Sequence, residues 1–348
     1  MNLKLTTMKL NIYKSKVRLA LTSILMIFLL LPGRVAFAQD DSTLAKTEAP
    51  AVQKPKPVKN TFQSVWIIDN QTVMVPVKGT FEMDINHRFG LWNKGYEDFW
   101  GFFAPSNIRL GASYAPVKNL FVGIGVTKTT AANIPYAEAP STVAGPMWDG
   151  SVKYSIITQT KGKFPVSVTY YGNLGYNTKS DTAHEIYLNN SDRLSFFNQV
   201  LVARKISDKL SVQVGASLSH QNLVNGYFTK NDSTSLKTEP EMEHNHFAIS
   251  VSARYKLTNV TSLLVNYDQP ITQHTKNNPN PNFSFGLEFN TSSHSFQLFF
   301  TNYYFLVPQV NNLFNTNDPL NHNAKADGSN PWSPEFLIGF NITRLWNY

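Results

Sequence analysis

Ionisable side chains recur at every second position of several apolar stretches in this chain of 348 residues. In the first such stretch, the carboxylates of Glu82 and Asp84 flank the apolar Met83. In this stretch and in others, the same alternation places further charges on the polar sides of the predicted strands, namely Lys78, Arg88, Arg109, Asp149, Lys153, Arg254, Asp268 and Glu288. A row of both signs suits a polar lumen, which is either a charge-lined pore or an interior closed by ion pairs. The sequence leaves both interpretations open.

The segment EMEHNHF, residues 241–247, is the strongest metal-binding candidate. His244 and His246 fall on one side of a strand with Glu241 nearby, and metal sites combine imidazole and carboxylate ligands. The segment also lies where a long polar loop enters a strand, and two histidines are ordinary in such a loop. We therefore predict no metal site and no cofactor.

Three other histidines, His87, His220 and His294, fall among the apolar positions of their strands. A histidine near serine on the outside of a barrel would suit a lipase-like enzyme of the outer membrane, which we keep as an alternative. However, the sequence contains no Gly-x-Ser-x-Gly nucleophile motif. Interfacial histidines at strand ends are the simpler interpretation, and we predict that the protein is not an enzyme.

Strict alternation of apolar and polar residues indicates strands, because successive side chains leave a strand on opposite faces. From Val77 to the C-terminus this pattern predicts about twelve strands. Their predicted bounds are 77–89, 107–115, 120–127, 147–157, 165–174, 193–205, 209–220, 245–256, 261–269, 282–290, 294–301 and 335–348.

The connections between these predicted strands alternate between long and short along the whole chain. The long ones are 90–106, 128–146, 175–192, 221–244, 270–281 and 302–334, and the short ones are 116–119, 158–163, 207–209, 257–260 and 290–293. Outer-membrane barrels have short periplasmic turns and longer extracellular loops. We therefore predict an all-β fold, a transmembrane, antiparallel, up-and-down β-barrel of about 12 strands spanning residues 77–348.

The apolar rows of these strands are large and rich in aromatic residues, so a soluble barrel of this size would have to hide them all in its interior. Many aromatic residues lie near strand ends, as in interfacial girdles, and the chain ends on an aromatic residue. We predict that the apolar rows face lipid, at Phe81, Met83, Ile85, Phe283, Phe285, Phe296, Phe340 and Ile342. The alternative is a secreted soluble β-barrel or sandwich with these rows as its core.

The N-terminal 76 residues divide into three parts. A basic region, the apolar run 19–31 and the small-x-small site Ala36–Phe37–Ala38 predict a cleaved signal peptide over 1–38. Residues 39–60 are rich in proline and lysine and read as an extended periplasmic linker. Residues 61–76 are apolar and predict a short hairpin or a plug.

The net charge of +8 is mostly a property of the predicted signal peptide. Six of the 31 basic residues and none of the 23 acidic residues lie in 1–38, which leaves about +2 for the rest. This balance gives no support to nucleic-acid binding. The absence of cysteine excludes a disulfide framework and thiolate chemistry.

Several stretches, among them SVWIIDNQTVMVPVKGTFEMDINHRFG, FFAPSNIRLGASYAP and FLIGFNITRLW, resemble an uncharacterised family of membrane β-barrels, catalogued as a domain of unknown function, in Gram-negative bacteria. The resemblance extends from about Thr61 to the C-terminus and implies an outer-membrane barrel with no assigned activity. We predict passive passage or binding of small polar solutes, with outer-membrane lipid and the barrel assembly machinery as partners. The alternative role is a structural barrel whose extracellular loops bind a partner.

Overall fold

The computed structural model describes residues 56–59, 61–129, 145–182, 186–232, 235–320 and 334–347. These residues belong to one compact unit, Lys54–Tyr348. The predicted signal peptide, 1–38, and residues 39–55 of the predicted linker lie outside the described residues. Within the described ranges, no helix is long and apolar enough to cross a membrane.

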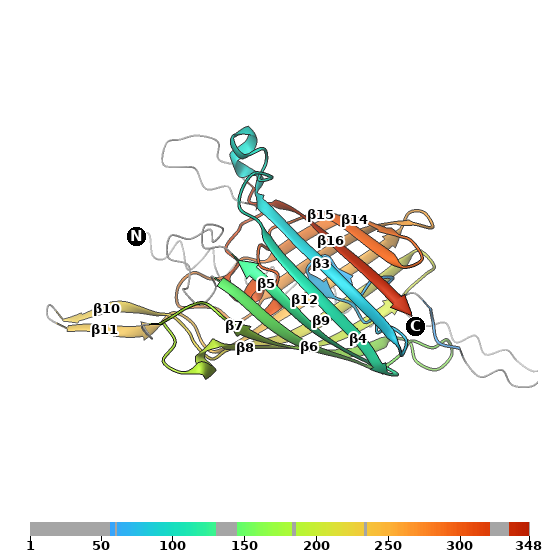
Figure 1. Cartoon of the computed structure of the whole chain (residues 1–348), viewed down its shortest axis with the longest axis horizontal. Helices are drawn as coiled ribbons and strands as arrows, with labels where there is room; N and C mark the ends of the chain where they lie inside the picture. Colours follow the sequence, from blue (N-terminus) through green and yellow to red (C-terminus); the bar gives the residue numbers. More distant parts are fainter. Residues whose placement is uncertain are drawn as a thin grey trace, which may run out of the picture. The chain divides into compact units, whose positions relative to one another are not determined.

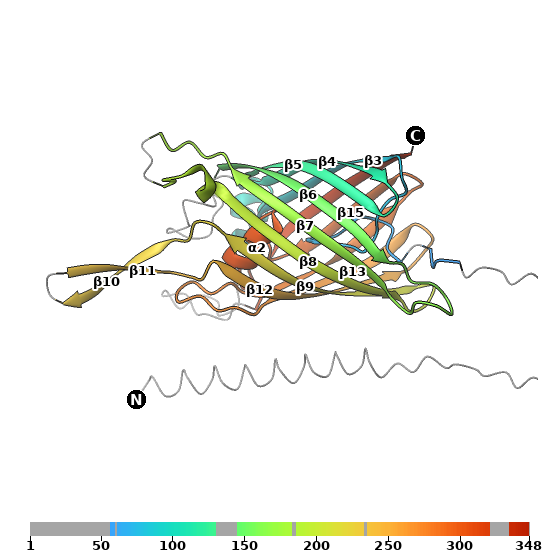
Figure 2. The ribbon, with the colours of Figure 1, turned by 90° about the horizontal axis from the view of Figure 1, so that it is seen from below.

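The prediction of a twelve-stranded antiparallel barrel is confirmed (Figures 1 and 2). The wall consists of β3 (Thr80–Leu91), β4 (Asn107–Val117), β5 (Leu120–Thr129), β6 (Gly145–Ile157), β7 (Ser167–Asn177), β8 (Leu194–Lys205), β9 (Leu210–Gln221), β12 (Asn245–Lys256), β13 (Thr261–Pro270), β14 (Asn282–Asn290), β15 (His294–Thr301) and β16 (Leu337–Asn347). The barrel closes where the last strand, β16, pairs with the first, β3.

Alternation along each strand sorts polar side chains to the inside and apolar side chains to the outside. In β14, for example, Asn282, Ser284 and Glu288 are buried, whereas Phe283 and Phe285 are exposed. This is the reverse of a soluble sheet, in which the apolar face is buried. A polar interior with an apolar exterior is the arrangement of a transmembrane barrel.

The observed strand bounds lie within three residues of the predicted ones at both ends of every strand. The largest difference at a strand start is in β3, which begins at Thr80 rather than at Val77. Gly79 adopts a left-handed conformation with φ of 89°, which forms a turn before the strand. Lys78 is therefore exposed outside the barrel wall, and its prediction as an interior charge was wrong.

Short turns join the strands at one end of the barrel and long loops join them at the other. Four long loops contain structure that the sequence patterns did not predict. The loops after β3 and β7 form the short 3-10 helices η1 (Trp92–Asp98) and η3 (Asn190–Arg193). The loop after β9 forms a hairpin of β10 (Gly226–Asp232) and β11 (Ser235–Pro240), which extends away from the barrel (Figures 1 and 2). The loop after β15 carries the helix α2 (Pro308–Phe314), which lies among the strands in Figure 2.

Residues 61–76, here called the lumen segment, lie inside the barrel. A minimal hairpin of β1 (Trp66–Ile67) and β2 (Asn70–Gln71) forms their centre. The turn between these strands holds Ile68 at φ of 55°, a left-handed conformation that a β-branched residue seldom adopts. Ile68 has no exposed surface, so contacts with the surrounding wall hold this strained turn in place.

Candidate functional site

The barrel interior collects the ionisable residues that the sequence pattern singled out. β3 supplies two carboxylates and one guanidinium, and five other strands supply the rest. Each of the nine is at most 5% exposed: Glu82, Asp84, Arg88, Arg109, Asp149, Lys153, Arg254, Asp268 and Glu288. Their inward direction follows from strand alternation, but their partners depend on the register between strands.

Arg109 joins two carboxylates from neighbouring parts of the wall. Its Nη1 donates to Asp84 Oδ2 at 2.7 Å, and its Nε and Nη2 donate to the two oxygens of Asp149 at 3.0 and 2.8 Å. Gly125 faces this guanidinium, and a Cβ at that position would lie 2.2 Å from Arg109 Nη2. Glycine is therefore required on β5 to leave room for the ion pairs.

A second ion pair lies on the opposite part of the ring, where Arg254 Nε donates to Glu288 Oε2 at 2.6 Å. Arg254 Nη2 also donates to the Gln63 side chain of the lumen segment. The interior charges thus form ion pairs with one another or contact the lumen segment. Glu82 Oε2 is an exception, since it is buried without a hydrogen-bond partner among the described residues.

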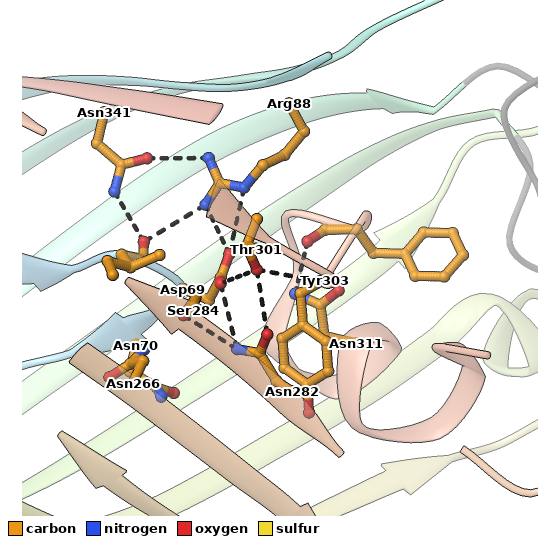
Figure 3. Close-up of polar contacts among 12 residues, drawn as sticks. Asp69, Asn70, Arg88, Asn266, Asn282, Ser284, Thr301, Tyr303, Asn311 and Asn341 are labelled. Carbon is orange, nitrogen blue, oxygen red and sulfur yellow. Dashed lines mark hydrogen bonds and ion pairs between the residues drawn. The ribbon is translucent and has the colours of Figure 1, made fainter. Parts of the chain in front are cut away.

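Asp69 in the lumen segment is the centre of a network that the sequence patterns missed (Figure 3). Its Oδ1 accepts from Arg88 Nη2 at 2.7 Å and from Arg88 Nε at 3.2 Å. Its Oδ2 accepts from Thr301 Oγ1 at 2.7 Å and from Asn282 Nδ2 at 3.3 Å. Next to it, Asn70 Nδ2 donates to Asp268 Oδ1 at 2.7 Å. The hairpin turn of the lumen segment is therefore bound to β3, β13, β14 and β15.

The backbone of the lumen segment is satisfied mainly by side chains of the wall rather than by a strand ladder. Gln213 on β9 accepts from the Val73 amide at 2.8 Å and donates to the Gln71 carbonyl at 2.8 Å. Gln297 on β15 likewise accepts from the Ile68 amide at 3.0 Å and donates to the Trp66 carbonyl at 2.8 Å. Buried amide side chains thus replace the neighbouring strand that a β segment ordinarily needs.

Apolar contacts add to these bonds on the inner surface of the wall. Phe62, Ile67, Ile68 and Val73 pack against a small apolar patch made by Leu201, Ala203, Leu264 and Phe299. Val65 and Trp66 pack against Ala115 and Phe121, which lie beside the short turn between β4 and β5. The lumen segment therefore extends from the short turns, at Val65 and Trp66, to the long-loop ends of β14 and β15, where Asp69 binds Asn282 and Thr301.

A second inserted segment, residues 302–318, fills the interior from the long-loop end and is called the loop insert. Its side chains pack with Met147, Met242 and Leu337 near the long-loop ends of the strands. Reciprocal bonds between Asn302 and Asn317, at 2.9 and 3.0 Å, close its base. In α2, Gln309 Nε2 donates to the wall at Asn173 Oδ1 and Ser195 Oγ.

The eight residues predicted to face lipid all lie on the outer face of the wall. Met83, Phe283, Phe285 and Phe296 are between 39% and 43% exposed, and Phe81, Ile85, Phe340 and Ile342 are partly exposed.

The outer face also carries the three histidines of the lipase-like alternative. His87 stacks on Phe340 with ring centroids 4.8 Å apart, and His220 contacts the side chains of Asn245 and Asn222. His294 stacks on Phe296.

The candidate ligands of the EMEHNHF segment do not converge on one point. Glu241 accepts from Asn277, and the imidazoles of His244 and His246 contact the carbonyl oxygens of Gln221 and Glu243. Among the described residues, no group of three or more His, Asp or Glu side chains is arranged to hold a metal ion.

His246 instead meets His274, a residue of the loop after β13, edge to face with ring centroids 4.6 Å apart. Both side chains are buried. Burial, reinforced by the charge of His246, lowers the pKa of His274 to about 4. The neutral form of His274 is therefore the one that the folded loop accommodates at neutral pH.

Residues 62–346 match the family model described as "Membrane bound beta barrel domain (DUF5777)". The chain belongs to this family. The resemblance stated from the sequence is thereby confirmed, and the protein is a membrane-bound β-barrel. Curated proteins yielded no match.

Solved structures with a similar fold are porins and channels. A KdgM porin in complex with disordered oligogalacturonate is 7% identical to this chain, with a TM-score of 0.43; the match covers 76% of this chain and 98% of the porin. A NanC porin is 8% identical, with a TM-score of 0.40; the match covers 77% of this chain and 99% of the porin. The COG4313 outer membrane channel of Pseudomonas putida F1 is 11% identical, with a TM-score of 0.40; the match covers 78% of this chain and 97% of the channel. At these TM-scores, the likeness says nothing about what the DUF5777 barrel binds or passes.

The apolar outer surface of the DUF5777 barrel is the surface that a membrane-bound protein needs. A spanning strand must turn apolar side chains toward lipid while its backbone groups stay paired with neighbouring strands. The outward rows supply such side chains, and the closed ring leaves no strand edge unpaired.

Proposed function

We propose that this chain is an outer-membrane β-barrel of a Gram-negative bacterium that passes small polar solutes when its lumen segment is displaced. The observation that carries the proposal is the lumen segment itself, which lies in a polar interior and is bound to wall residues such as Arg88, Gln213 and Gln297. The interior is thus occupied at rest, and passage depends on movement of the inserted chain.

The character of the contacts supports such movement. Six bonds of the lumen segment join a backbone group to an amide side chain of the wall, and water can replace either partner. Bonds to charged side chains, such as those between Arg88 and Asp69, hold the segment more strongly. Exchange of a protein hydrogen bond for bonds with water costs only about 0.5–1.5 kcal/mol net. The apolar contacts of Phe62, Ile67 and Val73 oppose release, so the closed form is the resting one.

The wall charges support a solute that is polar and small rather than strongly charged. Arg109 and Arg254 are already paired with carboxylates of the wall, and Arg88 is paired with Asp69. Release of the lumen segment would expose charges of both signs to the solute. These ion pairs do not form a ring of charges of one sign, which is the arrangement that selects anions or cations in other channels.

A cysteine pair tests the proposal directly, because the chain has no cysteine of its own. Val73→Cys and Gln213→Cys place thiols at a contact where the backbone amide of Val73 and the side chain of Gln213 are 2.8 Å apart. We expect intermittent conductance and solute uptake in liposomes with the free thiols. A short bifunctional thiol reagent should then abolish both by fixing the segment to β9.

The same double variant provides the matched control, since only the cross-link differs. A variant that lacks both the lumen segment and the loop insert supplies the fully open reference. Equal conductance before and after complete cross-linking would contradict the proposal. So would impermeable wild-type protein in bilayers where the open reference conducts.

The β10–β11 hairpin supports a second candidate function, binding of an extracellular partner. In the described residues, this hairpin pairs only with itself, and Phe228 on it is 71% exposed. Replacing residues 226–240 by a short Gly-Ser link tests this role. Loss of surface binding with unchanged permeability would favour it over solute passage.

A further inference from the structure

A cluster of five aromatic side chains projects from the loop between β3 and β4. We call it the aromatic knob, and it consists of Tyr96, Phe99, Trp100, Phe102 and Phe103. It includes the end of η1 (Trp92–Asp98), the short helix that stands beside the long-loop end of β3 in Figure 1. Tyr96 and Phe103 are each 80% exposed, and the other three are between 40% and 44% exposed.

The knob has a fixed shape. The Gly90 amide donates to the Gly101 carbonyl at 3.0 Å, which ties the loop back to the end of β3. Within the loop, the Trp100 amide donates to the Gly95 carbonyl at 2.6 Å. Phe99 and Trp100 both adopt left-handed backbone conformations, with φ of 52° and 54°. Non-glycine residues hold such strained conformations only where their surroundings enforce them, often at functional positions.

The five rings pack on one another, yet each of the five residues keeps at least 40% of its surface exposed. Phe99 is central, with ring centroids 5.3 Å from Trp100, 5.4 Å from Phe103 and 5.9 Å from Phe102. Exposed apolar clusters of this kind mark a surface that meets lipid or another molecule. The loop therefore presents its aromatic residues outward instead of burying them against the barrel.

The knob is continuous with the outer apolar face of the wall. Phe102 contacts Phe89 with ring centroids 4.6 Å apart, and Phe89 in turn lies 6.1 Å from Phe340, one of the predicted lipid-facing residues. At the start of the loop, Trp92 packs on Phe300 at 5.3 Å. A surface joined in this way to the membrane-facing wall lies at the rim where the wall leaves the hydrocarbon region.

We propose that the aromatic knob inserts into the lipid layer beside the long-loop rim, at the boundary between headgroups and acyl chains. Tyrosine and tryptophan concentrate at this depth in membrane proteins because their rings are apolar and their polar tips reach water. Lys94, Glu97 and Asp98 in the same loop supply charges that can remain among the headgroups. The inference holds whether or not the barrel passes solutes.

Spin labelling of single cysteines tests this inference in the intact protein. Tyr96→Cys and Phe103→Cys carry the label on the knob, Met83→Cys marks the outer wall, and Phe228→Cys marks the distant hairpin. All four positions are at least 43% exposed, so each has room for the label. In liposomes of phosphatidylcholine, we expect labels at 96 and 103 to be more accessible to oxygen than to a water-soluble nickel chelate. The label at 228 should show the opposite ratio.

Two results would overturn the inference. One is a pair of knob labels as accessible to the nickel chelate as the label at 228, which would place the knob in water. The other is spin–spin broadening at 103 that persists at high protein concentration and vanishes on dilution with lipid, which would assign the knob to a contact between copies of this chain. Heat-modifiable gel mobility verifies that each labelled barrel is folded.

Discussion

The Asp69→Asn variant should release the lumen segment from the barrel. Asp69 is the only carboxylate among the described residues that forms an ion pair with Arg88, and Arg88 is 1% exposed. Asparagine keeps the shape of the side chain but removes its charge. It also turns an amide group toward Thr301 or Asn282, both of which donate to the native carboxylate. The closed form thus keeps a buried guanidinium without its counter-ion.

The size of the effect follows from this burial. Removing one partner of a buried ion pair costs about 3–5 kcal/mol. The lower end applies here, because Arg88 retains the Asn341 side chain and the His87 carbonyl as acceptors at 3.1 and 2.9 Å. In the released form, water solvates the guanidinium and the cost disappears. A difference of about 3 kcal/mol shifts the ratio of released to bound segment by roughly a hundredfold.

Thiol labelling measures this ratio in the Val73→Cys background. Val73 is 6% exposed in the closed barrel, so a water-soluble maleimide reaches this position only after release. We expect the labelling rate of Asp69→Asn to exceed that of the background by roughly a hundredfold. Adding Arg88→Met, which removes the stranded charge, should bring the rate back toward the background. Equal labelling rates with and without Asp69→Asn, in folded barrels, would refute the reasoning.

Three further predictions concern the wall and the loops. Arg109→Met should lower the free energy of unfolding in urea by about 3–5 kcal/mol, because two buried carboxylates lose their counter-ion. The triple variant with Asp84→Asn and Asp149→Asn should recover most of that loss, and no recovery would contradict the ion-pair explanation. Met83→Arg should cost on the order of 2–4 kcal/mol in lipid, and a neutral effect would place Met83 away from the bilayer. Because the folded pKa of His274 is about 4, below the usual 6.5, the stability of its loop is present above pH 6.5 and lost as pH falls toward 4. Hydrogen-exchange protection of residues 271–281 should decline over that range, and His274→Gln should reduce the decline; part of it remains because burial also disfavours the charged form of His246.

The wall could be predicted from the sequence because its signal is local. In β12, β14 and β15, the alternating pattern defines the same bounds as the structure. An apolar residue between two polar ones points outward whatever strand lies beside it. The inward charges follow from the same rule, which is why Glu82 and Glu288 were identified without knowledge of their neighbours.

The pairing of those charges could not be predicted, because it depends on register across the closed ring. Arg109 meets Asp84 through the β3–β4 register and reaches Asp149 across β5, where Gly125 leaves space. A shift of two residues along β6 would keep Asp149 inward yet move it away from Arg109. Alternation constrains the face of a residue but not its position along the barrel axis.

The inserted segments were the least predictable part of the candidate site. Asp69 lies in a short turn with no periodic pattern around it, so nothing local marks it as the partner of Arg88. The loop insert gave a clearer signal in retrospect. Tyr303 to Val307 are consecutive aromatic and apolar residues in a loop expected to face water. Such a run, too short for a spanning strand, indicates burial inside the barrel.

The number of strands explains why the interior needs two inserts. Eight-stranded barrels fill their interior with their own side chains, whereas barrels of sixteen or more strands leave a channel. Twelve strands give an intermediate width, and here the inserted chain fills it. Strand number and stagger fix the diameter whatever the contents, so removal of the inserts should leave a water-filled lumen rather than a collapsed wall.

The lumen segment and the loop insert obstruct the interior one after the other along the barrel axis. The lumen segment packs near Ala115 and Phe121 toward the short turns, and the loop insert packs near Met147 and Leu337 toward the long loops. They meet where Asp69 binds Thr301, the last residue of β15 before the loop insert begins. Removing either insert alone should therefore raise conductance less than removing both. If either single deletion conducted as well as the double deletion, the other insert would not obstruct the path.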